Sequence, residues 1–295
     1  MSISTTTERE IRSQPEVWAR AVTVAGEGAP VLGRPGERVL LLGCGTSAFV
    51  AESLAVLRER AGHGETDAAY ASEWTPGRAY DRVVAISRSG TTSEVLEALS
   101  LVPVGTVKAA VVGVAGSPVV AAADEALVLD FADEESVVQT RFPTSVLALA
   151  RTGFGEDLSP VLDQASAVLA APLPVDPARF GHFVFLGRSW SYGLAQEAAL
   201  KIREAAQAWS ESYPALDYRH GPVAVAGETS LVTLFGDADP ALAADIERTG
   251  ATVRHWDLDP LVQLVQAQRL AVELAEARGL DADNPRHLTR SVVLG

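Results

Sequence analysis

Short apolar runs alternate with longer helix-like segments along most of the chain. In the first half we expect buried strands over Arg38–Gly43, Arg82–Ile86, Val107–Val112 and Ala126–Asp130. The segments between them read as helices over Ala48–Arg58, Ser93–Leu101 and Thr144–Arg151. Short continuous apolar runs separated by helices are typical of a parallel sheet with crossover helices.

The pattern changes between Thr152 and Arg179. This stretch holds one amphipathic helix, at about Leu158–Ala170, and a proline-containing connector, Ala171–Pro177, so we place a boundary between two units there. The alternation then resumes, with expected strands and helices followed by a tail over Asn284–Gly295. The strands are His182–Leu186, Ser230–Phe235 and Ala251–Trp256, and the helices are Tyr192–Trp209, Pro240–Thr249 and Leu261–Arg278.

Two strand-glycine-helix segments occupy comparable places in the two halves. They are Leu41–Ser47, with the letters LLGCGTS, and Phe185–Ser191, with the letters FLGRSWS. The similarity is weak in letters and stronger in layout. We interpret it as two copies of one α/β module.

The composition narrows the classes of protein that fit. Aromatic residues are only 6% of the chain, so the core is aliphatic, and the formal net charge is −14. That charge argues against nucleic acid and anionic membranes as partners, although a single phosphate can still be bound by backbone N–H groups. Cys44 is the only cysteine, which excludes an internal disulfide and a cysteine-based zinc site. With no long apolar run and a polar N-terminus, we expect a cytoplasmic protein.

The segment Ser87–Thr92 is the first candidate for chemistry. It follows a buried strand, opens a helix, and reads SRSGTT, with four hydroxyls, one glycine and one arginine. A dianionic phosphoryl group is bound well by hydroxyls and N–H groups at the positive end of a helix. Helix capping is the alternative, but one Ser would be enough for that. We therefore favour an anion site.

The segment Gly43–Ser47 is a second strand-to-helix turn. Its glycines permit close approach of backbone to a ligand, which makes Gly45, Thr46 and Ser47 candidates. A tight turn without a ligand is the alternative. The third glycine of a dinucleotide fingerprint is missing, which argues against an NAD-dependent oxidoreductase.

Two further groups carry titratable side chains. Glu197, Lys201 and Glu204 share one helix face, either as a solvated salt-bridged surface or as a tuned acid/base group. His220 lies in the run Tyr218–Pro222, in a turn, where it is either catalytic or an exposed loop histidine. No His, Asp and Glu cluster has metal-ligand spacing.

Taken together, these motifs resemble the sugar isomerase (SIS) fold, especially the isomerase half of glucosamine-6-phosphate synthase and stand-alone sugar-phosphate isomerases and deaminases. The resemblance includes Glu10–Pro15, Glu135–Thr144 and Asn284–Leu288. It implies two tandem SIS domains, each a parallel-sheet three-layer αβα (flavodoxin-like) sandwich. The implied limits are an N-terminal helical segment at 1–28, domains at 29–165 and 166–282, and a tail at 283–295 that closes over the active site.

The resemblance also implies roles for individual residues. Ser47, Ser87, Arg88, Ser89 and Thr92 match positions that hold the sugar phosphate. Glu204 matches the carboxylate that moves a proton between C1 and C2, with Lys201 and Glu197 in support. His220 matches the imidazole that helps to open the sugar ring and reaches in from the neighbouring subunit, so a homodimer with shared active sites is expected. No cofactor or metal is implied.

Three departures from the family affect the expected reaction. Arg290 aligns with the lysine that forms a Schiff base in the family, and a guanidinium cannot form that imine. Either the reaction proceeds without that imine, or Arg290 only orients the anionic substrate. Gln139 stands where the family has a small hydroxyl residue that meets the sugar. The resemblance includes no glutaminase domain, so glutamine-dependent amidotransfer is not expected. We therefore expect an aldose-ketose isomerase or an aminosugar-6-phosphate deaminase; the alternative is a non-catalytic phosphosugar sensor or regulator.

Overall fold

The computed structural model describes residues 5–294, which form two compact units. The first unit comprises Ser13–Leu162 and the C-terminal segment from Thr289; the second comprises the N-terminal segment up to Arg12 and Asp163–Leu288. Residues 1–4 of the expected N-terminal helical segment lie outside the described residues. The units therefore divide the chain at different places from the SIS domain limits expected above, which stay predictions.

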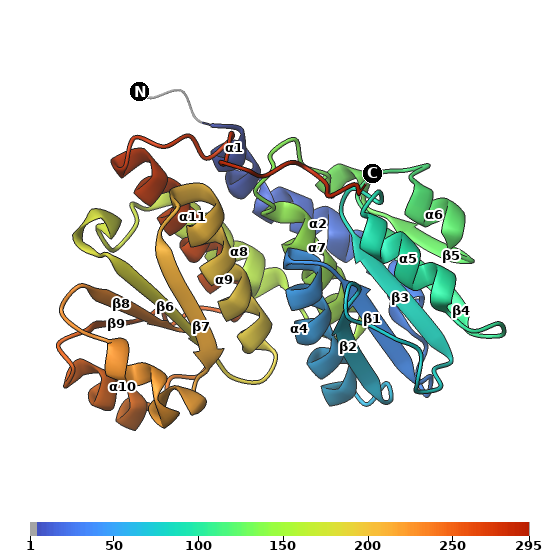
Figure 1. The fold of residues 1–295 in the computed structure, drawn as a ribbon, viewed down its shortest axis with the longest axis horizontal. Helices are drawn as coiled ribbons and strands as arrows, with labels where there is room; N and C mark the ends of the chain where they lie inside the picture. The colour runs from blue at the N-terminus through green and yellow to red at the C-terminus, as the bar shows by residue number, and fades with distance from the viewer. Residues whose placement is uncertain (1–4, 295) are drawn as a thin grey trace. The chain divides into compact units, whose positions relative to one another are not determined.

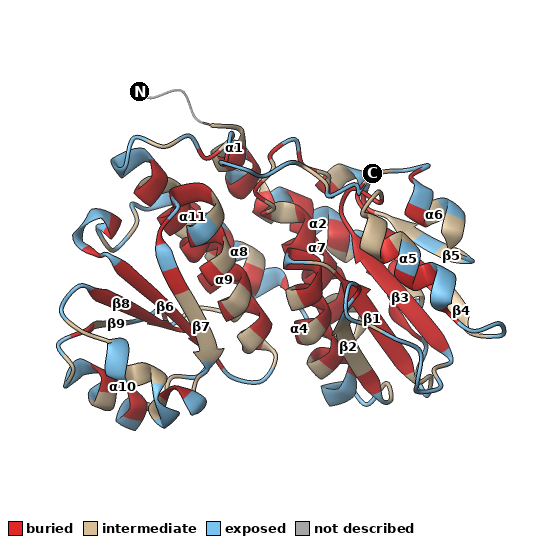
Figure 2. Cartoon of the chain, in the orientation of Figure 1, coloured by how far each residue is buried: buried red, intermediate tan, exposed pale blue. Residues whose placement is uncertain are grey.

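The first unit is built on a five-stranded parallel sheet with the order β2-β1-β3-β4-β5 (Figure 1). This order is that of flavodoxin-like doubly wound folds. The central strands are buried along their whole length, and Figure 2 shows this for β1 and β3. The strands are β1 (Val39–Gly43), β2 (Thr66–Tyr70), β3 (Arg82–Ser87), β4 (Val107–Val112) and β5 (Glu125–Val128).

Helices cover both faces of this sheet. Alternate strand residues such as Leu40, Val83 and Ala110 pack with α5 and α6 in one apolar cluster, while α4 and α7 lie on the other face (Figure 1). The helices are α2 (Gln14–Thr23), α3 (Ala25–Gly28), α4 (Thr46–Arg60), α5 (Ser93–Leu101), α6 (Pro118–Ala122) and α7 (Arg141–Gly153), with short 3₁₀ turns η1 (Ala29–Leu32) and η2 (Asp130–Ala132). Helix α8 (Ser159–Ala170) spans the division between the units.

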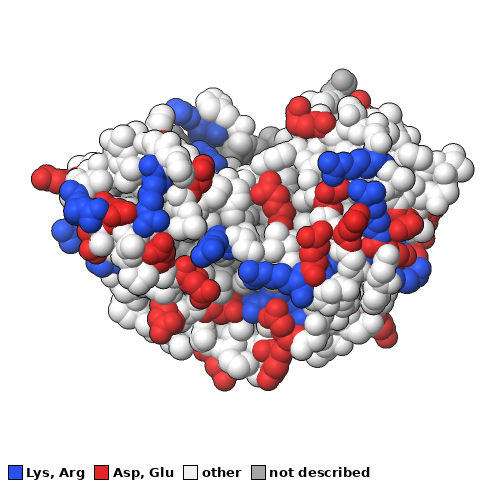
Figure 3. All heavy atoms as spheres, turned by 90° about the horizontal axis from the view of Figure 1, so that it is seen from below, with Lys and Arg blue, Asp and Glu red and all other residues white. Residues whose placement is uncertain are grey.

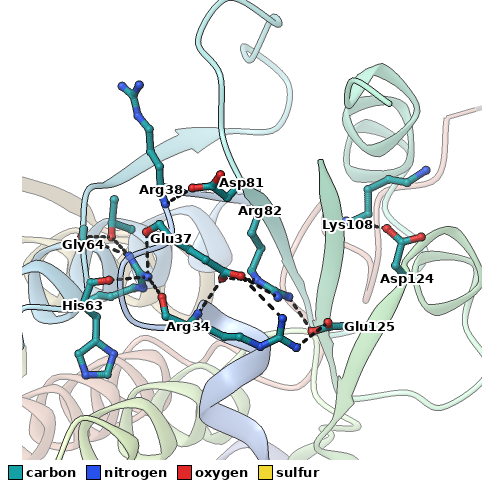
Figure 4. A network of polar contacts seen from close by, with 12 residues as sticks. Arg34, Glu37, Arg38, His63, Gly64, Asp81, Arg82, Lys108, Asp124 and Glu125 are labelled. Carbon is teal, nitrogen blue, oxygen red and sulfur yellow. Dashed lines mark hydrogen bonds and ion pairs between the residues drawn. The ribbon is translucent and has the colours of Figure 1, made fainter. Parts of the chain in front are cut away.

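A charged network stabilises the end of the first sheet where the strands begin (Figure 4). Arg82, the first residue of β3, is fully buried, and its guanidinium lies 2.9 Å from Glu37 Oε2 and 2.7 Å from Glu125 Oε2. The buried Arg58 guanidinium nearby donates to several backbone carbonyls, among them that of His63 at 2.9 Å. Because Ser87 is the last residue of β3, this network lies at the opposite end of the strand from the candidate anion loop.

The second unit is built on a four-stranded parallel sheet with the order β7-β6-β8-β9. The order matches the first four positions of the first sheet. Val184, Val232 and Ile246 belong to one apolar cluster that includes α10. The strands are β6 (His182–Gly187), β7 (Trp209–Pro214), β8 (Ser230–Leu234) and β9 (Thr252–His255). The helices are α1 (Thr6–Arg12), α9 (Ser191–Ala206), α10 (Pro240–Glu247) and α11 (Pro260–Ala277), with 3₁₀ turns η3 (Pro177–Arg179), η4 (Asp217–His220) and η5 (Pro222–Val225).

The predictions from sequence did not include the strand at one edge of each sheet. Strand β2 was not expected, and the helix expected over Tyr192–Trp209 is too long, because α9 ends at Ala206 and Trp209 begins β7. Gln207 terminates α9 in the left-handed conformation, with φ of +49°. Both missed strands carry polar residues and are only partly buried, so they lack the continuous apolar run that marks a central strand.

Within residues 5–294 we find no helix that combines the length and apolarity needed to cross a bilayer. On the face drawn in Figure 3, basic and acidic side chains are interspersed.

Candidate functional site

The strand order of the first sheet reverses between β1 and β3, which pair directly in parallel. In open α/β sheets, ligands bind at such a switch point, outside the carboxyl ends of the strands. Gly43 ends β1 and Ser87 ends β3, so the segments Gly43–Ser47 and Ser87–Thr92 leave neighbouring strands at the same edge. The structure thus brings together the two loops that the sequence singled out.

The Gly43–Ser47 turn depends on glycine at two positions. A Cβ on Gly43 would lie 2.4 Å from the carbonyl carbon of Ser47, and Gly45 has φ of +52°. Thr46 and Ser47 are buried at the start of α4, whose N-terminus has no side-chain cap. The N-cap residue of α4 is Gly45, which has no side chain and so provides no capping acceptor for the first N–H groups of the helix.

The Ser87–Thr92 loop folds back on itself. Gly90 N donates to Ser87 Oγ at 3.2 Å, and the Thr91 hydroxyl donates to Ser89 Oγ at 3.0 Å. Thr92 occupies the N-cap position of α5, yet its side chain makes no capping hydrogen bond. Capping, the simpler explanation of these hydroxyls, therefore does not account for Thr92.

Arg88, expected at the phosphate, and Arg290, expected to orient the anionic substrate, are both engaged with protein oxygens. Arg88 is buried, and its terminal nitrogens donate to the carbonyl oxygens of Ser136, at 2.6 Å, and Arg290. Arg290 Nη2 pairs with both carboxylate oxygens of Asp133, at 2.5 and 2.7 Å. Gln139 is half-buried, and no described residue hydrogen-bonds to its Oε1. The assignment of these three residues to the ligand stays a prediction.

The second unit holds the predicted acid/base group on α9. Glu197 and Lys201 each have only 1% of the side chain exposed, and the Lys201 ammonium lies 3.2 Å from Glu197 and 2.5 Å from Glu204. The alternative of a solvated helix face is therefore wrong for Glu197 and Lys201. Burial opposes the charge on Lys201, but attraction to both carboxylates outweighs it and raises the pKa of the ammonium. Lys201 thus stays protonated and holds Glu204, which is 19% exposed.

His220 lies at the end of η4 and is exposed, as the loop alternative expected. The neighbouring Tyr218 is fully buried, and burial raises the pKa of its phenol to about 12. His220 borders a cavity of about 330 Å³, together with Arg188, Ser189 and Asp217. Arg188 and Ser189 were missed as candidates; their place in the repeated FLGRSWS segment was the signal that could have pointed to them.

A larger cavity, of about 450 Å³, lies in the second unit among α1, α11 and η3. Glu273, Arg12 and Arg269 contribute to its wall, and none of the predicted site residues does. Volume alone therefore does not locate the candidate chemistry. Across residues 5–294, the acidic, histidine and cysteine side chains form no group of three or more suited to a metal ion.

The fold and its loops define a doubly wound α/β protein with a hydroxyl-rich loop at the switch point of its first sheet. More specifically, residues 34–151 match the family model of the SIS domain. The match covers β1 to β5 and both loops.

The chain is similar to known proteins whose names mention a sugar phosphate. The chain is 28% identical to glutamine--fructose-6-phosphate aminotransferase [isomerizing] of Thermus thermophilus, over 97% of this chain and 58% of that protein. It is 28% identical to the crystal structure of glucosamine-6-phosphate deaminase from Thermotoga maritima, with a TM-score of 0.82 over 98% of this chain and 100% of the other. Tagatose-6-phosphate ketose/aldose isomerase from Escherichia coli shares the fold, at 21% identity, a TM-score of 0.79, and coverage of 99% and 96%.

Proposed function

We propose that this protein binds a sugar phosphate and is either an aldose-ketose isomerase or an aminosugar-6-phosphate deaminase. The observation that carries the proposal is the pair of loops Gly43–Ser47 and Ser87–Thr92, which lie together at the switch point of a SIS domain. The names of the deaminase and isomerase relatives support this substrate class.

The phosphate is assigned to the first unit. Hydroxyls of Ser47, Ser87, Ser89 and Thr92, with N–H groups at the starts of α4 and α5, suit a dianion even in a chain with net charge −14. Binding by hydroxyls and amides needs no net positive charge on the protein. Gln139 is assigned to the sugar, because its Oε1 is buried and accepts no hydrogen bond from a described residue.

Proton transfer is assigned to Glu204. Isomerisation removes a proton from C2 of an aldose, forms an enediol, and returns a proton to C1; one carboxylate serves both steps. The protonated Lys201, 2.5 Å away, orients that carboxylate, and Glu197 supports Lys201. A deaminase begins with the same transfer in an aminosugar phosphate, which gives an imine at C2; water then adds to C2, and ammonia leaves as the ketose phosphate forms.

We also propose that the second unit is a second SIS domain and that the protein works as a cytoplasmic homodimer in which His220 serves the partner's site. Two matched turns support the repeat. A Cβ on Gly187 would lie 2.3 Å from the carbonyl oxygen of Ser191, just as a Cβ on Gly43 would lie too close to the backbone of Ser47. Two residues after each of these glycines the backbone has a positive φ, of +59° at Ser189 and +52° at Gly45.

The test is a pair of assays, one for ketose formation and one for ammonia release, run on glucosamine 6-phosphate and galactosamine 6-phosphate. Glu204→Gln should lower kcat by about 10²–10⁴-fold on the active substrate and leave its binding almost unchanged. Thr92→Ala should instead weaken binding. Full turnover by Glu204→Gln on every active substrate would exclude the assignment.

A non-catalytic phosphosugar sensor is the second candidate. The observation in its favour is Arg290, which replaces the lysine of the family and pairs with Asp133. Such a protein binds sugar phosphate tightly but exchanges no hydrogen at C2 in deuterated water. Exchange at C2 that requires Glu204 would exclude this candidate.

A further inference from the structure

Arg88 connects three segments of the first unit: the Ser87–Thr92 loop, the segment around Ser136, and the C-terminal segment. It follows β3 in the candidate phosphate loop, and its side chain is buried. One terminal nitrogen donates to the carbonyl of Ser136, in the segment before Gln139, and the other donates to the carbonyl of Arg290, in the C-terminal segment. Its own carbonyl accepts a hydrogen bond from Gly113 N at 2.9 Å.

The C-terminal segment from Thr289 is bound to the same loop at further points. Ser291 Oγ lies 2.6 Å from Thr91 Oγ1, Ser93 N donates to the carbonyl of Val292 at 3.3 Å, and Leu294 N donates to Ser93 Oγ at 2.9 Å. These contacts attach the segment along the start of α5. Hydrogen bonds to Thr91 and Ser93 therefore hold this segment against the loop and the start of α5.

A salt bridge fixes the same segment from the other side. Arg290 pairs through one nitrogen with both oxygens of Asp133, and Arg290 Nε donates to the carbonyl of Glu134 at 2.9 Å. The side chain of Arg290 thus holds the 133–136 segment, while its backbone carbonyl is held by Arg88. Two arginines join the loop, the 133–136 segment and the tail into one assembly.

We infer that Arg88 is a positioning residue that fixes the tail and the Ser136 segment against the phosphate loop, and that it does not bind the phosphate itself. A planar guanidinium reaches two carbonyls at once, and a lysine ammonium on a flexible stem does not reproduce that fork. The inference deepens the proposed function, because it assigns the anion to hydroxyls and amides alone.

Arg88→Lys separates the two roles, because it keeps the charge and removes the fork. Hydrogen–deuterium exchange of the ligand-free protein is the first measurement, on peptides that cover Ser93 and residues 289–294. We expect Arg88→Lys to speed exchange of these amides by about tenfold or more, since hydrogen bonds from a charged group are lost. Asp133→Asn should have a similar effect, and Thr92→Ala, the matched loop control, should leave exchange within about twofold of wild type.

Binding of fructose 6-phosphate and of inorganic phosphate is the second measurement, in the full chain and in a chain that ends at Leu288. If Arg88 acts through the tail, Arg88→Lys weakens binding in the full chain and loses most of that effect in the shortened one. An undiminished effect in the shortened chain, or unchanged amide exchange in Arg88→Lys, would overturn the inference. If Arg88→Lys does not fold, Arg88→Gln is measured in its place, and unchanged amide exchange in that variant would overturn the inference.

The two proposals fail separately. A wild-type protein that binds neither probe contradicts the proposed function, while the exchange experiment still tests what Arg88 holds. Conversely, loss of phosphate binding in Thr92→Ala with normal tail exchange in Arg88→Lys supports the phosphate site and rejects the positioning role of Arg88.

Discussion

Lys201 Nζ lies 2.5 Å from Glu204 Oε2, so the carboxylate proposed as the catalytic base is held by a buried ammonium one helical turn away. The same ammonium is 3.2 Å from Glu197, whose side chain is 1% exposed. One cation therefore neutralises a structural and a candidate catalytic carboxylate. We therefore expect the stability of the fold to depend on the charge of Lys201.

Lys201→Met should lower the free energy of unfolding by about 3–5 kcal/mol, because it leaves Glu197 buried without its counter-charge. Urea unfolding measures the effect. The double variant Lys201→Met with Glu197→Gln is the control, and it should recover part of the loss because the buried charge is gone. A single variant as stable as wild type would show that Glu197 does not depend on Lys201.

Gly43→Ala and Gly187→Ala form a second, matched prediction. In each, the new Cβ would lie within 2.4 Å of backbone at the start of the following helix, which no side-chain rotation relieves. Each should cost about 1–3 kcal/mol of stability. Only Gly43→Ala should also weaken phosphate binding, because only that turn belongs to the proposed phosphate site.

Gly26→Ala is the control for this pair. Nothing lies within 4 Å of a Cβ at that position, so the substitution should be neutral or slightly stabilising. Equal loss of phosphate binding in Gly43→Ala and Gly187→Ala would contradict the assignment of the phosphate to the first unit.

The network around Arg82 predicts how stability depends on acid. A hydrogen bond from Arg82 lowers the pKa of Glu125 below its ordinary value of 4.5. Burial opposes this effect at Glu37, but hydrogen bonds from Arg82 and from the backbone of Arg34 outweigh it, so the pKa of Glu37 is lowered too. Both carboxylates bind protons more tightly in the unfolded chain than in the folded one.

Their contribution to stability is therefore present above about pH 4.5 and is lost as the pH falls through the lowered pKa values of the folded state. Urea unfolding at neutral pH and below about pH 4 measures the loss. In Glu37→Gln with Glu125→Gln the acid-dependent part should shrink. Glu65→Gln, at an exposed carboxylate that pairs with Arg38, is the control for a substitution outside the Arg82 network.

Sequence reasoning identified the central strands because they are buried on both faces, as the continuous run at β3 illustrates. It missed β2 and β7, which lie at sheet edges and mix polar with apolar residues. The candidate loops were found because each is one contiguous segment between a strand and a helix. The hydrogen-bond partners of Arg88 were not found, because Ser136 and Arg290 are distant from it in sequence. Both accept through backbone carbonyls, which every residue type has, so the sequence gives no sign of them.

Gly90 provides the sharpest test of the phosphate loop. It has φ of +64°, and a Cβ there would lie 2.0 Å from Ser117 Oγ and 2.5 Å from Ser117 Cβ. Gly90→Ala should therefore displace the loop and weaken fructose 6-phosphate binding by about tenfold or more, as measured by calorimetric titration. The protein should remain folded, because the loop lies beyond the carboxyl end of β3 and outside the sheet.

A second substitution, at Ser117, tests whether the clash between the new Cβ and Ser117 is what weakens binding in Gly90→Ala. Ser117 stands before α6, and its side chain makes no capping hydrogen bond there, so Ser117→Gly removes the clash without the loss of a cap. The double variant Gly90→Ala with Ser117→Gly should regain part of the affinity, and the strain of a positive φ at alanine should keep the recovery incomplete. Wild-type affinity in Gly90→Ala would show that the loop geometry does not matter for the phosphate. A folded double variant that binds no better than Gly90→Ala would show that the backbone conformation at Gly90, and not the clash with Ser117, sets the affinity.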